Sequence, residues 1–143
     1  MKIKEITLHE VQYIAHRLAR ELMQGDEPIP SFDTRYPRIL ESCLATPFQR
    51  FSRRNLYKGL AQKSAILFYL MIKNHPLENG NKRVAVTTLL VFLLKNGKWL
   101  KVDNQQLYNF AVWIAQSDAR FKNKIVDIVE EFIKNHLVLR NES

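Results

Sequence analysis

His75-Pro76-Leu77-Glu78-Asn79-Gly80-Asn81-Lys82-Arg83 joins the two most apolar segments of this 143-residue chain, residues 65–72 and 84–94. The stretch places an imidazole, a carboxylate, two amides, a glycine and two cations within nine residues. Each flanking segment is apolar on nearly every side, which is typical of a helix surrounded by other helices. A polar and charged loop held between two core helices indicates a functional site.

Helical periodicity extends outward from this loop in both directions. Thr7 and Glu10 have the spacing of a capping box at the start of the first helix, and Asp103 or Asn104 supplies the cap of a later one. The predicted helices cover residues 8–22, 38–45, 56–73, 80–94, 104–116 and 119–137. The sequence therefore predicts an all-α fold of about six helices, in which the charged loop joins two central helices.

Shorter segments separate these helices. Residues 25–37 hold three prolines, which remove amide donors and restrict the residues before them, so a loop is expected. Residues 98–102 alternate and predict a brief extended segment, and residues 47–54 predict a small extended or hairpin segment. Neither a repeat nor a linker interrupts the sequence, which predicts one domain over residues 1–143.

The composition is that of an ordinary soluble globular protein, with 46% hydrophobic and 25% charged residues. The longest apolar run, residues 84–94, is far shorter than the roughly 20 residues that a membrane span needs. Met1-Lys2-Ile3-Lys4-Glu5 does not resemble the start of a secretory signal. The single cysteine, Cys43, has no partner for an internal disulfide, as expected in a reducing compartment. We therefore expect a cytoplasmic protein with no membrane partner.

The formal net charge of +8 favours anionic partners such as nucleotides, nucleic acids or acidic proteins. The basic residues are spread along the chain, and only residues 50–54 and 82–83 form local clusters. A dedicated nucleic-acid groove is therefore not expected.

The charged loop contains the groups that a phosphate-transfer site needs. Residues 80–83 form the first turn of the following helix, where backbone amides lack helical partners and the helix dipole is positive. Gly80 lets an anion approach the backbone, and Lys82 and Arg83 add two positive charges, so this turn predicts a phosphate site. An imidazole titrates near neutral pH, so His75 suits the removal of a proton from a hydroxyl.

Glu78 and Asn79 supply hard oxygen donors of the kind that Mg²⁺ prefers. Together with the phosphate site, these groups indicate transfer of a phosphorus-containing group to a hydroxyl. The alternative is a structural loop, in which His75 caps the carbonyl groups of the preceding helix and Lys82 and Arg83 are solvated.

The stretch HPLENGNKR resembles the HxFx(D/N)(G/A)NKR motif of Fic/Doc proteins, in the death-on-curing (Doc) branch. Three sets of flanking residues also resemble the family: 35–42 with 47–49, 63–65 with 74–76, and 92–93 with 96–97. The resemblance therefore covers about residues 8–116. It implies a Fic/Doc-like helical bundle, in which residues 48–54 form the flap that aligns a target segment by backbone pairing.

The resemblance also implies roles for individual residues. His75 would be the general base, and Asn81 and Lys82 would complete the catalytic set. The implied nucleotide contacts are Gly80, Asn81, Lys82, Arg83 and Lys73. ATP and Mg²⁺ are the implied cofactors.

Two positions depart from the family motif. Leu77 replaces the usual Phe, which packs inward in the family, so only a modest packing change is expected. Asn79 stands where an acidic residue commonly holds Mg²⁺, and an amide oxygen ligates the ion without charge. Asn79 is therefore a weak metal ligand, with Glu78 as the alternative.

Two further positions favour the Doc branch over typical Fic adenylyltransferases. Lys82 is a lysine, as in Doc toxins, where the adenylyltransferases have glycine, and Val86 replaces their second arginine. The resemblance thus implies a Doc-like toxin of a bacterial toxin–antitoxin system. Such a toxin transfers the γ-phosphate of ATP to a Ser or Thr hydroxyl of a target protein, expected to be a translation factor such as elongation factor Tu.

Two other functions stay open from the sequence. One is AMP transfer to a protein hydroxyl, and the other is a non-enzymatic binding module, either a catalytically degenerate Fic-fold protein or a basic nucleic-acid binder. The inhibitory pattern [ST]xxxE[GN], which some family members carry within their own chain, is not found in this sequence. Regulation by a separate antitoxin protein is therefore expected.

Overall fold

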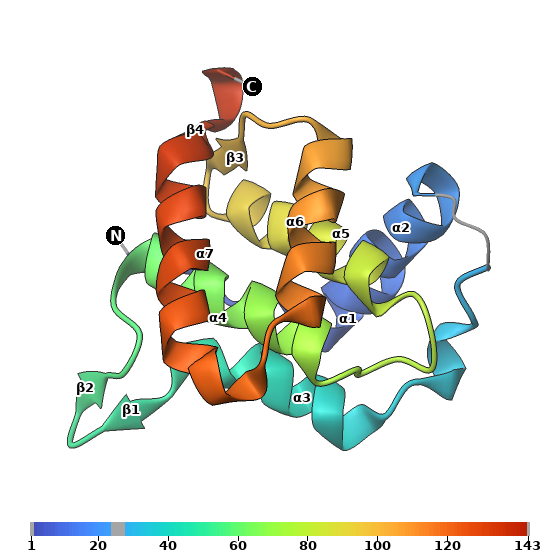
Figure 1. Cartoon of the computed structure of the whole chain (residues 1–143), viewed down its shortest axis with the longest axis horizontal. Helices are drawn as coiled ribbons and strands as arrows, with labels where there is room; N and C mark the ends of the chain where they lie inside the picture. Colours follow the sequence, from blue (N-terminus) through green and yellow to red (C-terminus); the bar gives the residue numbers. More distant parts are fainter. Residues whose placement is uncertain (1, 24–27, 143) are drawn as a thin grey trace.

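Two buried helices, α4 (Gly59–Lys73) and α5 (Asn81–Lys95), lie at the centre of the fold (Figure 1). The computed structural model describes residues 2–23 and 28–142 of the chain. Residues 63–72 of α4 and residues 84–89 of α5 are all buried. Both helices are apolar on every side because other elements surround them, as their sequences predict.

The remaining helices cover this central pair. The first helical segment consists of α1 (Leu8–Glu10), a π-helical turn (Val11–Ala15) and α2 (His16–Leu22), and α2 contacts α5. The helices that contact α4 are α3 (Pro37–Ala45), α6 (Asn104–Gln116) and α7 (Lys122–His136). Short 3-10 turns occupy Phe32–Thr34, Thr46–Phe48, Ala119–Phe121 and Arg140–Glu142. The predicted all-α bundle is confirmed.

Two short antiparallel ribbons complete the described structure. The first pairs β1 (Arg50–Phe51) with β2 (Arg54–Asn55), and the second pairs β3 (Lys98–Leu100) with β4 (Leu137–Leu139). Both predicted extended segments are therefore present. The last helix was expected to continue through residue 137, but α7 ends one residue earlier. The backbone from Leu137 onward pairs with β3 instead, a partner that no local pattern reveals.

The helix predicted over residues 56–73 begins three residues late, at Gly59. Gly59 has φ +74°, a left-handed conformation that glycine adopts without steric cost, and Lys58 before it is extended. The helix therefore cannot continue back to residue 56. The predicted loop at residues 25–37 is described only from residue 28 onward.

One cluster of buried apolar side chains connects the helices. Cys43 is fully buried within it, and burial raises the pKa of its thiol to about 11. The thiol therefore stays protonated at neutral pH, which excludes it as a reactive nucleophile. Within the described part of the chain, each helix is too short or too polar to cross a bilayer.

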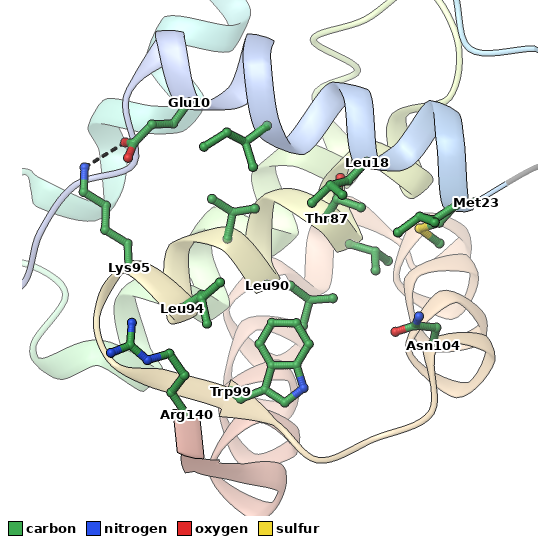
Figure 2. Close-up of a pocket in the computed structure, with 14 residues that line it drawn as sticks. Glu10, Leu18, Met23, Thr87, Leu90, Leu94, Lys95, Trp99, Asn104 and Arg140 are labelled. Carbon is green, nitrogen blue, oxygen red and sulfur yellow. Dashed lines mark hydrogen bonds and ion pairs between the residues drawn. The ribbon is translucent and has the colours of Figure 1, made fainter. Parts of the chain in front are cut away.

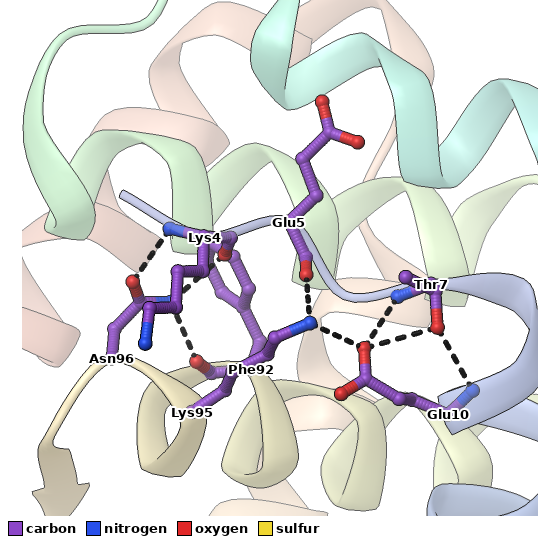
Figure 3. Close-up of polar contacts among 7 residues, drawn as sticks. All are labelled: Lys4, Glu5, Thr7, Glu10, Phe92, Lys95 and Asn96. Carbon is purple, nitrogen blue, oxygen red and sulfur yellow. Dashed lines mark hydrogen bonds and ion pairs between the residues drawn. The ribbon is translucent and has the colours of Figure 1, made fainter. Parts of the chain in front are cut away.

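The capping box predicted at Thr7 and Glu10 is present (Figure 3). The Thr7 hydroxyl accepts from the Glu10 amide at 3.1 Å, and Glu10 Oε1 accepts from the Thr7 amide at 2.9 Å. Lys95 Nζ donates to Glu10 Oε1 at 2.7 Å and to the Glu5 carbonyl at 2.8 Å. These bonds fasten the start of α1 to the carboxyl end of α5.

We expect Thr7→Ala to lower the free energy of unfolding by about 1 kcal/mol at neutral pH, because it removes an N-cap.

Burial alone would raise the pKa of Glu10, but hydrogen bonds from Lys95 and Thr7 outweigh burial and lower it. The stabilisation from Glu10 is therefore full above its ordinary pKa of 4.5 and is lost as pH falls through the lower folded-state pKa. In urea denaturation, the stability difference between wild type and Glu10→Gln should shrink in acid. A difference that does not change with pH would contradict this assignment.

Candidate active site

The loop between α4 and α5 lines a cavity of about 410 Å³. The structure brings most of the predicted site residues together around it, namely His75, Glu78, Asn79, Gly80, Asn81, Lys82 and Arg83. Ile72 at the end of α4, and Tyr108 and Ala115 of α6, also line this cavity. The stretch that the sequence singled out therefore forms one continuous site.

The amino-terminal end of α5 faces this cavity. Gly80 is its N-cap, with φ +78°, and among the described residues no side chain caps the helix. The amides of residues 81–83 follow, where a helix has no hydrogen-bond partners of its own and the dipole is positive. The half-buried Lys82 and Arg83 add full positive charges, and Arg83 Nη1 contacts the Met23 carbonyl at 3.4 Å. The end of α5 is thus suited to bind a phosphate group.

His75 follows the last turn of α4, where Asn74 is the C-cap residue. His75 has φ +50°, a left-handed conformation that histidine and asparagine adopt more readily than most residues. This conformation turns the chain out of the helix, and the His75 side chain is exposed at the cavity. The imidazole is therefore accessible to a substrate.

Asn81 fastens the loop to α5 and orients its amide toward His75. Asn81 Oδ1 accepts from the Leu77 amide at 2.8 Å, and Nδ2 donates to the Leu77 carbonyl at 3.0 Å. These bonds turn Nδ2 toward His75 Nδ1, 3.4 Å away, which is a long and weak contact. The Asn81 amide therefore lies beside the imidazole that lines the cavity.

A sequence model of the Fic/DOC family matches residues 5–93, which is more than half of the chain and includes the whole loop. The chain belongs to the Fic/DOC family. Enzymes of the Fic/DOC family transfer AMP or phosphate to proteins. Searches of curated proteins and of solved structures gave no match. The part of α6 that lines the cavity lies beyond the Fic/DOC match.

The buried Leu77 fits the Fic/DOC motif, in which the residue at this position packs inward. Leu77 retains only 2% of its surface exposed, so replacement of the usual Phe leaves the side chain in the core. The side chain thus packs inward, and the expected modest change in packing stays a prediction.

Residues 28–36, which were expected to be a plain loop, lie directly against the Fic/DOC loop. The Tyr36 amide donates to the Pro76 carbonyl at 2.9 Å. Ile29 is buried beside Gly80, so close that a Cβ atom at Gly80 would lie 2.8 Å from Ile29 Cγ1. Gly80 is therefore needed both for its left-handed backbone and for its lack of a side chain.

We expect Gly80→Ala to lower the free energy of unfolding by more than Gly59→Ala does. Both glycines have left-handed φ angles, which cost a non-glycine residue roughly 1–2 kcal/mol. Only Gly80 also has a close neighbour, since a Cβ at Gly59 would meet nothing within 4 Å. Urea denaturation of the two variants measures the extra cost of the Ile29 contact. Equal destabilisation would show that Ile29 moves aside freely.

The hairpin of β1 and β2 does not lie at the Fic/DOC site, although residues 48–54 were expected to form the flap beside it. The hairpin precedes α4, and His75 follows the other end of that helix (Figure 1). The 15 residues of α4 span about 22 Å at 1.5 Å per residue. No residue from 48 to 54 lines the cavity. The assignment is therefore wrong, and residues 28–36 are the segment that accompanies the loop.

Lys73 is a predicted nucleotide contact that the structure does not bring to the cavity lining. Its Nζ donates to the Ala115 carbonyl at 3.3 Å and to the Ser117 carbonyl at 2.5 Å. These carbonyls are at the carboxyl end of α6, where a cation also interacts favourably with the helix dipole. Lys73 thus links α4 to α6.

The described residues include no group of three His, Cys, Asp or Glu side chains that could hold a metal ion. Glu78 and Asn79 do line the cavity, and Asn79 Oδ1 accepts from the Gly80 amide at 2.8 Å. Amide and carboxylate oxygens are hard donors of the kind that Mg²⁺ takes in proteins. These donors fit Mg²⁺ that takes most of its ligands from phosphate and water.

A larger cavity of about 470 Å³ lies between the α1–α2 segment, α5 and β3 (Figure 2). Its lining is mainly apolar, with Leu18, Leu90 and Trp99 around it, and the Glu10–Lys95 ion pair lies at its edge. Arg140 also lines this larger cavity, whereas the smaller cavity places His75 beside the amino-terminal end of α5. The smaller cavity is therefore the candidate active site.

Tyr108 is a site residue that the sequence did not reveal. It follows the buried Leu107 in α6 and is itself half-buried at the cavity. The spacing of apolar residues in α6 identifies the face of this helix that packs inward. It does not reveal which other segment of the chain packs against that face. Only the packing of α6 against α4 and α5 places Tyr108 at the Fic/DOC loop.

Proposed function

We propose that this Fic/DOC protein is a Doc-like toxin that transfers the γ-phosphate of ATP to a Ser or Thr hydroxyl of a target protein. A translation factor in the cytoplasm is the expected target. The observation that supports the proposal is that one cavity holds His75 together with Lys82 and Arg83 at the start of α5. A hydroxyl bound in this cavity would meet a proton acceptor and a phosphate-binding helix end at the same time.

His75 would accept the proton of the target hydroxyl as the hydroxyl oxygen bonds to the γ-phosphorus. The bond from that phosphorus to the β,γ-bridging oxygen breaks, and ADP leaves. The amides of residues 81–83, Lys82 and Arg83 would stabilise the negative charge on the phosphate oxygens. Glu78 and Asn79 would hold Mg²⁺, which neutralises phosphate charge when bound.

Two residues favour phosphate transfer over AMP transfer. Lys82, the lysine typical of Doc toxins, lines the cavity. Val86 is fully buried and lines the apolar cavity, so its position supplies no second cation to the phosphate site. The arginine pattern of the family's adenylyltransferases is therefore incomplete in this chain.

Mass spectrometry of purified elongation factor Tu incubated with the protein and ATP tests the proposal. A gain of one phosphoryl group on a Ser or Thr supports it. A gain of AMP replaces it with adenylylation. If neither elongation factor Tu nor other translation factors are modified while expression still arrests growth, a binding module replaces it.

A separate antitoxin protein is the second partner that we propose. An apolar segment of the antitoxin would cover the larger, mainly apolar cavity between the α1–α2 segment, α5 and β3. Leu22 and Leu94, which line this cavity, are exposed. The cavity begins at Val86, about one helical turn from Arg83, so the antitoxin would lie close to the phosphate site. Co-expression with a small acidic protein encoded just upstream should restore growth. Continued growth arrest would count against this partner.

We expect Asn79→Asp to lower the Mg²⁺ concentration needed for half-maximal activity several-fold. A carboxylate adds charge to the metal site, yet it can still accept the hydrogen bond from the Gly80 amide. Activity and Mg²⁺–ATP binding should be titrated for wild type, Asn79→Asp and the control Asn79→Ala. An unchanged Mg²⁺ dependence in Asn79→Asp would exclude position 79 as a metal ligand.

A further inference from the structure

The hairpin of β1 and β2 projects from the body of the fold and takes no part in the proposed transfer site (Figure 1). All residues from 49 to 56 are exposed. Phe51 keeps 71% of its surface exposed, so its ring contributes little to the core. A single exposed ring is common on protein surfaces, so its neighbours decide what it can bind.

The strand register places Phe51 beside an arginine. Phe51 and Arg54 are direct cross-strand partners, so their side chains extend from the same face of the ribbon. Arg50 and Asn55 pair on the opposite face. Arg50 Nη2 donates to the Arg53 carbonyl at 2.6 Å, which ties the turn to the first strand. One face of the hairpin therefore presents a ring and a guanidinium side by side.

The turn adds a second guanidinium at the tip of the hairpin. Ser52 and Arg53 have φ +50° and +67°, the left-handed pair of a type I′ turn. Asn-Gly is the usual choice for such turns because it adopts these angles with less strain. Here the tip instead carries Arg53, whose side chain is exposed.

The basic residues of the hairpin have no acidic residue close to them in the sequence. No Asp or Glu lies between Glu41 and Glu78. The same stretch contains Arg50, Arg53, Arg54 and Lys58. In the part of the chain that the structure describes, the ion pairs involve none of these four cations. The hairpin is therefore an uncompensated basic surface.

A buried lysine holds the base of the hairpin. Lys63 Nζ donates to the Pro47 carbonyl at 3.0 Å and to the Tyr57 carbonyl at 2.6 Å, so it joins the chain before and after the ribbon. The Leu56 amide also donates to the Gln49 carbonyl at 3.1 Å. The hairpin is thus pre-organised, which lowers the entropy cost of binding.

We propose that this hairpin binds single-stranded nucleic acid, with a base stacked on Phe51 and backbone phosphates bound by Arg53 and Arg54. Sequence-tolerant single-strand sites combine aromatic rings with arginine in this way. An acidic peptide would use the arginines but would leave the ring without a role. The inference does not rest on the proposed transfer reaction, since α4 separates the hairpin from His75.

Fluorescence anisotropy of the full-length protein with fluorescein-labelled oligouridine tests the proposal. Phe51→Ala should weaken binding about tenfold, the loss of one base–aromatic stack. The double variant Arg53→Gln/Arg54→Gln should reduce the slope of log K against log salt by about 1.4, because each lost phosphate contact on a single strand contributes about 0.7. Every substituted side chain is exposed, so circular dichroism should be unchanged.

A matched control removes the same charge from α2, in the exposed pair Arg17→Gln/Arg20→Gln. This control should retain the wild-type affinity and salt slope. An equal loss in the control, or no effect of Phe51→Ala, would overturn the proposal. Labelled oligoglutamate provides the second arm of the test. If it binds as tightly as oligouridine, the hairpin is a docking site for acidic proteins and the nucleic-acid proposal fails.

Discussion

Replacement of His75 by asparagine is expected to lower the rate of phosphate transfer by about 10²–10⁴-fold, the range typical of general-base catalysis. Asparagine tolerates the left-handed backbone that His75 adopts at φ +50°, so the loop should keep its structure. Growth arrest on induced expression should be lost at the same time. Transfer of labelled γ-phosphate to the target measures the rate directly.

The control for this experiment is His9→Asn, because His9 is an exposed histidine of α1 outside the cavity. It should leave both growth arrest and phosphate transfer unchanged. If His75→Asn transfers phosphate as fast as wild type, His75 is not the base. If it still arrests growth without any transfer, toxicity arises from binding.

The second large effect is expected at Lys82. Lys82→Met should lower kcat by about 10²–10³-fold, as is typical when one pre-organised group that stabilises transition-state charge is removed. The side chain is half-buried at the cavity rather than in the core, so thermal stability should change little. Single-turnover phosphate transfer at saturating ATP isolates this effect from nucleotide binding.

Lys124→Met removes the same charge from an exposed position of α7 and is the matched control. It separates loss of the local cation from the general fall in net charge. If Lys82→Met and Lys124→Met have equal kcat values, Lys82 does not stabilise the transferring phosphate. The Doc-like assignment would then lose one of its two supporting residues.

The features that the sequence predicted correctly depend on residues that are close together in the chain. The capping box needs only Thr7 and Glu10, three residues apart, and both form it. The cavity was predictable because most of its groups belong to residues 75–83. A turn that leads directly into a helix brings such groups together without help from the rest of the fold.

The features that the sequence did not predict depend on packing between distant segments. Lys73 bonds to carbonyls 42 and 44 residues further along, a contact that no local pattern encodes. Tyr108 and Ile29 reach the loop only when their segments pack against it. Residues 47–54 did predict an extended or hairpin segment. The position of this hairpin relative to His75, however, depends on the length and direction of α4.

The turn at Asn96 and Gly97 has a consequence for how the chain opens locally. The Lys4 amide donates to Asn96 Oδ1 at 2.8 Å, and Asn96 Nδ2 donates to the Lys4 carbonyl at 3.0 Å (Figure 3). The Arg140 amide donates to the Gly97 carbonyl at 3.1 Å. One turn thus holds segments from both ends of the described chain. In hydrogen exchange, the amides of Lys4 and Arg140 should therefore behave as one cooperative unit, although 135 residues lie between them in the chain.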